Sequence, residues 1–156
     1  MTTPRDSPAE LAKFYGKVGE NQVILELPYP MKLSWDLSST VTRFSCHKKV
    51  RDSLRGILET TLAHYGADAI RQLGLDRFSG CLNVRRKRGG TTWSTHSWGI
   101  ALDLWDDKNQ LKWNHTKAVF ARPEYRAFWD AVAGHGWTGL GPARDFDWMH
   151  IQAAHL

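Results

Sequence analysis

The clearest periodic pattern of apolar residues runs from residue 48 to residue 65. The apolar residues recur at spacings of four, three, one, four and three: Val50, Leu54, Ile57, Leu58, Leu62 and Tyr65. This pattern predicts one face of an amphipathic helix that Gly66 ends, and a second short helix is expected over residues 68–75. We interpret the apolar face as core packing rather than as a chemical site.

A second pattern, strict alternation, predicts a strand from Gly99 to Trp105. Ile100, Leu102 and Leu104 fall on one of its faces and Asp103 falls on the other. Two further helices are expected, over residues 10–16 and 123–133. Strands are expected over residues 80–84 and 148–152, with one more short strand within the loop-rich residues 17–44. A turn-rich link through Gly139 and Pro142 leads to the last strand. Together they predict an α+β fold in which helices pack on a small, mainly antiparallel sheet.

The length of 156 residues is typical of one domain, spanning residues 1–156. Residues 1–9 are polar and contain prolines, so we expect a loose arm there. Cys46 and Cys81 do not form a disulfide framework or a Cys-x-x-Cys pattern, and their spacing allows either buried thiols or a single bridge. The N-terminus lacks the apolar core of a signal peptide, and no apolar run approaches the ~18 residues of a membrane span. We therefore expect cytoplasmic synthesis, no membrane span and a monomer.

Charge and aromatic content indicate a binding surface. The net charge of +5 favours an anionic partner, such as nucleic acid, a membrane surface or a polyanionic cell wall. The one tight basic cluster covers residues 85–88, where the alternative interpretation is a solvated loop. Eight tryptophans are a mild indication of a cleft for sugars or peptides.

Two polar segments supply the residues of a metal site. His96 lies seven residues before Asp103, with Gly99 between them to allow a sharp bend and Ala101 to leave space. His150 would be the third ligand if the last strand pairs near the first. Catalytic zinc is held by three such protein ligands, with water in the fourth position. The alternative is that these are ordinary histidines and surface carboxylates, since seven histidines make chance combinations common.

A catalytic site of this kind also needs a carboxylate beside the water that does not bind the metal. Asp147, three residues before His150, is the best candidate, and Asp145 is the second choice. Residues three apart in a regular strand face opposite sides. Asp147 must therefore lie just before the strand or at a bulge to act as the general base.

Both segments resemble motifs of one enzyme family. Residues 94–103, Ser-Thr-His-Ser-Trp-Gly-Ile-Ala-Leu-Asp, resemble the Ser-x-His-x-x-Gly-x-Ala-x-Asp motif of the M15 metallopeptidases. This family includes D-alanyl-D-alanine carboxypeptidases and dipeptidases and phage L-alanyl-D-glutamate endopeptidases. Residues 147–152, Asp-Trp-Met-His-Ile-Gln, are similar to the closing motif of the phage-type branch, and residues 81–89 are similar to the segment that precedes the first motif in some members.

The resemblance implies the M15 zinc peptidase fold, with one Zn²⁺ per chain and Asp147 as the general base. The implied metal ligands are His96, Asp103 and His150. The resemblance also implies that Ser94 lies beside the substrate and that an arginine binds a substrate carboxylate or polarises the scissile carbonyl.

The arginine is where the chain departs from the family. The commoner pattern carries it in a Gly-Tyr-Arg-Ser-like segment further upstream, which is missing here. Arg85 is the first choice, and Arg86 and Arg88 are the alternatives. Guanidinium groups suit the stem peptide of peptidoglycan, because they bind carboxylates bidentately and that peptide is rich in them.

The resemblance therefore implies hydrolysis of the peptidoglycan stem peptide, as an L-Ala–D-Glu endopeptidase or a D-Ala–D-Ala carboxypeptidase. An endolysin-like protein would reach the cell wall after phage lysis or as a virion component. The alternative is a non-catalytic, zinc-stabilised cell-wall-binding or phage structural module, which would bind zinc but cleave nothing. A third class, a binder of anionic polymers, would bind DNA in a salt-dependent way without metal. No nucleic-acid motif is present, so we expect no nucleic-acid partner.

Overall fold

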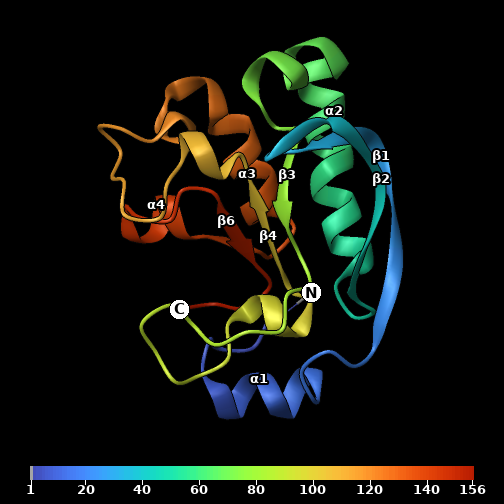
Figure 1. The fold of residues 1–156 in the computed structure, drawn as a ribbon, viewed down its shortest axis with the longest axis vertical. Helices are drawn as coiled ribbons and strands as arrows, with labels where there is room; N and C mark the ends of the chain where they lie inside the picture. The colour runs from blue at the N-terminus through green and yellow to red at the C-terminus, as the bar shows by residue number, and fades with distance from the viewer. Residues whose placement is uncertain (1) are drawn as a thin grey trace.

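In the computed structural model, residues 2–156 form four α-helices and six β-strands, with short 3₁₀ turns between some of them (Figure 1). In chain order these are α1 (Pro8–Tyr15), β1 (Gln22–Leu33), β2 (Asp36–His47), α2 (Arg51–Leu73), β3 (Arg77–Gly80), β4 (Ala101–Leu104), α3 (Arg126–Gly134), β5 (Thr138–Gly139), α4 (Leu140–Arg144) and β6 (His150–Gln152). The predicted α+β class is confirmed.

All six strands belong to one sheet, in the order β2-β1-β3-β4-β6-β5. Four of the five strand pairings are antiparallel, and β1 with β3 is parallel. The parallel pair follows from the connection, because the chain passes through β2 and α2 between the two strands. The sheet is therefore mixed, with the antiparallel pairing that the sequence predicts as its main component.

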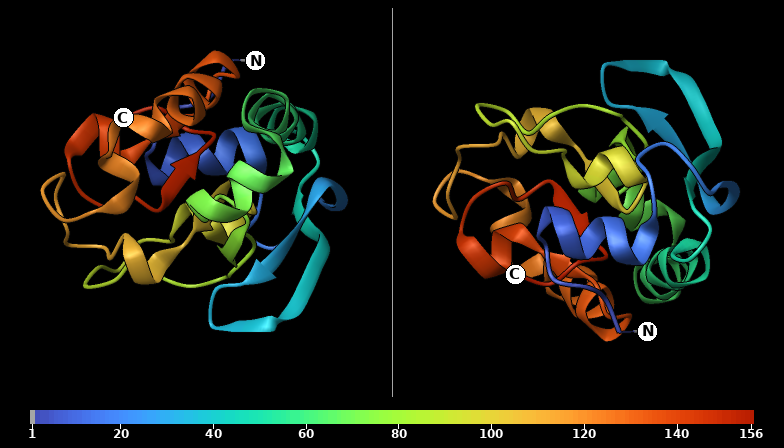
Figure 2. Two further views of the ribbon diagram at one scale, coloured as in Figure 1. Left: turned by 90° about the horizontal axis from the view of Figure 1, so that it is seen from above. Right: turned by 90° about the horizontal axis from the view of Figure 1, so that it is seen from below.

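The hairpin of β1 and β2 was not expected. Residues 17–44 were interpreted as loop-rich with one short strand, and this was wrong: two strands of 12 residues pair there. Pro28 and Pro30 suggested a loop, but they fall where the register shifts between Glu26 and Met31, an irregularity at which strands tolerate proline. Figure 2 shows the hairpin extending from one side of the molecule.

The predicted amphipathic helix is confirmed as α2, which runs further than expected. Gly66 interrupts its backbone with a φ of 79° rather than ending it, and Gly74 ends it in the left-handed conformation. The two expected helices are thus two halves of one kinked helix that packs against β1 and α3. Leu54 and Leu58 on its apolar face are fully buried.

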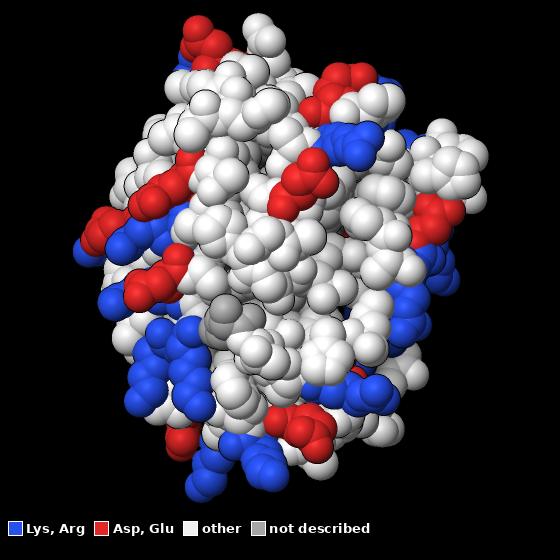
Figure 3. Space-filling view, turned by 180° about the vertical axis from the view of Figure 1, so that it is seen from behind, with Lys and Arg blue, Asp and Glu red and all other residues white. Residues whose placement is uncertain are grey.

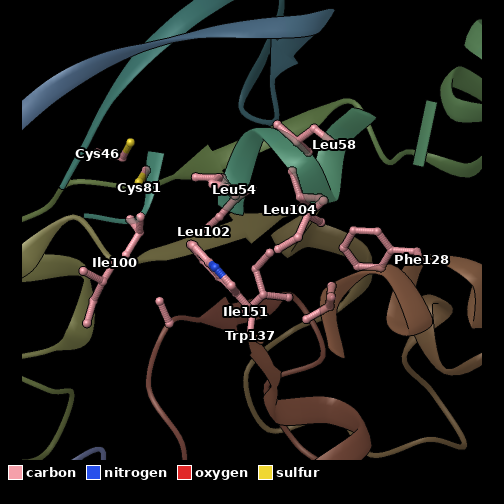
Figure 4. Close-up of a cluster of buried hydrophobic side chains, with 14 of the residues drawn as sticks. Cys46, Leu54, Leu58, Cys81, Ile100, Leu102, Leu104, Phe128, Trp137 and Ile151 are labelled. Carbon is pink, nitrogen blue, oxygen red and sulfur yellow. The ribbon is translucent and has the colours of Figure 1, made fainter. Parts of the chain in front are cut away.

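The core lies between α2, α3 and the inner strands of the sheet. Leu102 and Leu104 of β4 meet Leu54 and Leu58 on one side, and Ile151 of β6 lies beside them (Figure 4). Because side chains alternate along β4, the face opposite this core is left for polar residues.

The two cysteines lie near one another in the core as buried free thiols (Figure 4). Burial raises the pKa of the Cys46 thiol to about 12. Of the two interpretations that the spacing allowed, the structure has the thiols.

Residues 1–9 were expected to be a loose arm, and for the described residues 2–9 the structure corrects this. The backbone N–H of Asp6 donates to the carbonyl of His155 (2.7 Å), and that of His155 donates to Pro4 (2.9 Å). Pro8 already opens α1. The segment is therefore bound along the C-terminal end of the chain; Met1 lies outside the described residues.

Three further boundaries differ from expectation. The strand expected over 80–84 lies earlier, at Arg77–Gly80, and the last strand begins only at His150. Residues 138–144, expected as a turn-rich link, form β5 and α4. Within residues 2–156, no helix is long and apolar enough to cross a membrane.

Candidate metal centre

The pairing of β4 with β6 brings the two predicted metal-binding segments together. Asp103 lies directly opposite His150 in this antiparallel pair, so both side chains project from the same face of the sheet. His96 comes from the 3₁₀ turn Thr95–Trp98 just before β4. Gly99 joins turn and strand with a φ of 70°, a left-handed conformation that favours glycine, and a Cβ there would displace the end of the Gln22 side chain.

The three predicted ligands converge. His96 Nε2 lies 3.1 Å from Asp103 Oδ2, and His150 Nδ1 lies 3.0 Å from Asp103 Oδ1. One ligand atom from each residue lies within 4.8 Å of the other two. Both histidines are buried, with 3% and 6% exposure. The cluster is therefore compact enough to hold a metal ion.

The orientation of the His96 ring is the strongest indication of a ligand. Its Nδ1 donates to the carbonyl oxygen of Cys81 at 2.7 Å, which leaves Nε2 as the nitrogen with a lone pair when the ring is neutral. Nε2 is buried, and its contact with Asp103 Oδ2 at 3.1 Å lacks the geometry of a hydrogen bond. A backbone carbonyl that orients a histidine in this way is typical of metal sites.

His150 is oriented from the opposite side of its ring. Its Nε2 donates to Gln152 Oε1 at 2.8 Å, so Nδ1 faces the cluster. The donor set is then two imidazole nitrogens and one carboxylate oxygen, which is a set that zinc takes in catalytic sites. The residues present fit such an ion.

Electrostatics make Asp103 and His150 an ion pair when no metal is bound. Burial opposes ionisation of Asp103, but the two histidines outweigh it and hold the pKa of this carboxyl well below its usual range. Burial likewise opposes protonation of His150, yet the hydrogen bond and charge of Asp103 raise the pKa of His150 to about 9. A metal ion must therefore displace a proton from His150 at neutral pH.

Asp147 lies in the turn immediately before β6. It adopts the left-handed conformation, with a φ of 53°, and its backbone N–H donates to Leu111. Its Oδ2 reaches to 4.0 Å from His150 Nδ1. Burial raises the pKa of Asp147, and the charge of His150 opposes this. The condition set by the sequence, that Asp147 precede the strand, is met.

Asp145, the second choice as base, forms hydrogen bonds away from the metal cluster. Its carboxylate accepts hydrogen bonds from the backbone N–H and Nδ1 of His115, at 2.6 and 2.7 Å, and from Trp148 Nε1 at 3.1 Å. These bonds hold two surface segments together, and Asp145 does not line the hollows at the metal cluster.

Two hollows of about 440 and 530 Å³ meet at His96 and Asp103. The smaller has a polar wall formed by Ser79, Asn83, Asp106, Gln110 and Lys112. The larger has apolar residues under a basic rim, namely Leu140, Phe146 and Leu156 with Arg5, Lys87 and Arg144. The cluster thus lies where two chemically different parts of one cleft join.

The structure separates the three candidate arginines. Arg85 and Arg88 line both hollows. Arg86 instead stacks on Trp93, with its guanidinium carbon 3.6 Å from the ring centroid, and lines neither hollow. Ser94 lines the larger hollow, and its hydroxyl accepts a hydrogen bond from the backbone N–H of His96. Arg86 is therefore placed away from the predicted substrate cleft.

Two residues in the hydrogen-bond network behind His150 were not assigned a role from the sequence. Gln152 follows His150 by two residues, so strand periodicity alone puts it on the same face, a signal that was present. Asp6, which contacts Gln152, lies 146 residues away in the chain and carries no such signal.

Comparisons of the chain with protein-family models, with curated proteins and with solved structures find no match. The resemblance to the M15 metallopeptidases therefore stays a prediction that rests on the motifs.

Proposed function

We propose that this protein is a zinc-dependent peptidase that hydrolyses the stem peptide of bacterial peptidoglycan. The observation that carries the proposal is the convergence of His96, Asp103 and His150, in which the buried Nε2 of His96 faces the carboxylate of Asp103 without a hydrogen bond. A buried imidazole nitrogen that makes no hydrogen bond costs free energy, and a bound metal ion would remove that cost.

The carboxylate of Asp147 is the proposed general base. A zinc ion held by the three ligands would supply an activated water and a Lewis acid for the scissile carbonyl. Asp147 Oδ2 would take the proton from the attacking water and pass it to the leaving amine. Its raised pKa suits both transfers, because a base works best when its pKa approaches the working pH.

Arg85 and Arg88 are the proposed substrate-binding residues. Both line the two hollows, so their guanidinium groups can bind carboxylates of a peptide that lies across the cluster. A cleft that continues on both sides of the metal ligands favours cleavage inside a peptide. We therefore propose L-Ala–D-Glu endopeptidase activity ahead of D-Ala–D-Ala carboxypeptidase activity.

One face of the molecule carries no continuous basic surface among residues 2–156. The face turned away from the viewer in Figure 1 carries charges of both signs, interspersed around an uncharged centre (Figure 3). Duplex binders need a continuous basic surface to neutralise several phosphates. The basic residues that line the cleft, Arg85 and Arg88 among them, suit a short acidic peptide instead.

The test is metal content together with digestion of purified peptidoglycan. We expect one zinc per chain by mass spectrometry of the metal, and fragments with a new N-terminal D-Glu by mass spectrometry of the digest. Chelation should abolish the fragments and zinc should restore them. Free D-Ala alone would indicate a carboxypeptidase. Zinc without cleavage would indicate the non-catalytic wall-binding module, and protein without zinc would refute the proposal.

A further inference from the structure

A chain of hydrogen bonds joins the third predicted ligand to the N-terminal segment. His150 Nε2 donates to Gln152 Oε1 at 2.8 Å, and Gln152 Nε2 donates to Asp6 Oδ2 at 2.9 Å. Gln152 is almost fully buried, and the Asp6 side chain is 14% exposed. The carboxylate of Asp6 thus lies two hydrogen bonds from the imidazole of His150.

The surroundings fix the direction of both bonds. The amide nitrogen of Gln152 faces two acceptors, Asp6 Oδ2 and the carbonyl oxygen of Ala154 at 3.4 Å. An ionised carboxylate and a carbonyl can only accept, so the amide cannot turn over without placing its oxygen against them. The hydroxyl of Thr95, which donates to Gln152 Oε1 at 3.3 Å, stabilises the same orientation.

This orientation determines which nitrogen of His150 is available. Gln152 Oε1 can only accept, so neutral His150 must carry its proton on Nε2. The lone pair is then on Nδ1, the nitrogen that lies 3.0 Å from Asp103. If the amide of Gln152 turned over, its nitrogen would face Nε2 and favour the tautomer that cannot bind a metal through Nδ1.

We propose that Asp6 is a positioning residue of the metal centre. Acting through Gln152, it sets the tautomer and the ring orientation of His150, and so strengthens metal binding by a ligand that it does not touch. Lys87 lies 3.8 Å from Asp6 Oδ1 and compensates its charge, which links the basic segment to the same network. The inference rests on the metal site of the proposed function but not on peptidase activity.

The test measures zinc affinity by competition with a chromophoric chelator at constant pH and salt. Removing a partner that orients a ligand costs about 10- to 100-fold in metal affinity, so we expect Asp6→Ala to weaken binding about tenfold. The matched control is His155→Ala, which removes the bond from His155 Nδ1 to the carbonyl of Thr3 (3.0 Å) but keeps the Asp6 carboxylate. It loosens the same segment and should leave the affinity within about twofold of wild type.

A reversed pair tests whether Asp6 acts through Gln152. Gln152→Glu alone places a second carboxylate against Asp6 and should weaken binding. Adding Asp6→Asn lets the new amide donate to Glu at position 152, whose other oxygen still accepts from His150 Nε2. The double variant should therefore bind zinc more tightly than Gln152→Glu alone, a non-additivity that shows that the two side chains act as a pair.

The possible results distinguish the role of Asp6 from the zinc site and from the peptidase activity. Wild-type affinity in Asp6→Ala, an equal loss in His155→Ala, or a double variant no better than Gln152→Glu would overturn the role of Asp6 while leaving the zinc site intact. Wild-type protein that binds no zinc would instead overturn the proposed function, and the inference with it. Zinc binding that follows the expected pattern without peptidase activity would support the role of Asp6 and contradict only the peptidase.

Discussion

Asp103 and His150 face each other across the β4–β6 pair, with His150 Nδ1 3.0 Å from Asp103 Oδ1, although 47 residues separate them in the chain. Register alone brings them together. A slip of one residue would turn His150 to the apolar face and dismantle the cluster. The neighbouring pair Leu102 and Ile151, buried on the core side, opposes that slip.

Removal of either histidine should abolish metal binding and activity together. We expect His96→Ala and His150→Ala to lose zinc measured by metal analysis, because two remaining ligands do not hold the ion tightly. His64→Ala, on the exposed face of α2, is the control and should retain wild-type zinc content. Full zinc occupancy in either cluster variant would contradict the ligand assignment.

Replacement of the proposed base should separate binding from catalysis. Asp147→Asn should keep zinc but lower kcat by about 10²- to 10⁴-fold, the usual contribution of a general base. Asp145→Asn is the matched control, since Asp145 forms an exposed pair with His115, and we expect little change in kcat. Near-normal turnover by Asp147→Asn in a muropeptide assay would remove Asp147 from the mechanism.

The arginines should differ in their effect on substrate. Arg85→Lys keeps the charge but loses bidentate binding, so kcat/KM for a stem-peptide substrate should fall about tenfold. Arg86→Lys changes a side chain that stacks on Trp93 outside the cleft and should have a smaller effect. Equal losses in the two variants would contradict the assignment of substrate binding to Arg85 rather than Arg86, and no loss in either would show that only the charge of the cluster matters.

Zinc binding should release a proton at neutral pH. The pKa of His150 is about 9 in the metal-free protein, so this imidazole is protonated at pH 7 and must lose its proton to bind. Apparent zinc affinity should rise about tenfold per pH unit up to about pH 9 and then level off. Titration calorimetry in buffers of different ionisation enthalpy measures the released proton, and no release at pH 7 would contradict the ion pair.

The stability of the metal-free protein should fall at both low and high pH, where one member of the Asp103–His150 ion pair loses its charge. The folded pKa of His150 is raised from 6.5 to about 9, so its contribution is complete below pH 6.5 and is lost as pH rises through 9. The folded pKa of Asp103 is lowered, so its contribution is lost as pH falls below its usual value of 3.8. Thermal unfolding after chelation should give the highest Tm between these limits, and a Tm unchanged from pH 6.5 to 9 would contradict the pair.

Local patterns determined much of the fold from the sequence. The apolar spacing from Val50 to Tyr65 predicted α2, and the alternation from Ile100 to Leu104 predicted β4, because helix and strand periods depend only on backbone geometry. The motif around His96 and Asp103 also lies within one short segment. The hairpin of β1 and β2 was missed because Pro28 and Pro30 act as breakers unless a register shift accommodates them.

The tertiary structure decided what depends on distant contacts. Strand register placed His150 beside Asp103. The left-handed backbone conformation of Asp147 turned its carboxylate toward the site, and stacking on Trp93 placed Arg86 outside the cleft. The contact of Asp6 with Gln152 spans 146 residues and has no periodicity or motif that reports it. Such contacts depend on how whole elements pack against one another. Packing between distant elements leaves no local pattern in the sequence, so only the tertiary structure reveals it.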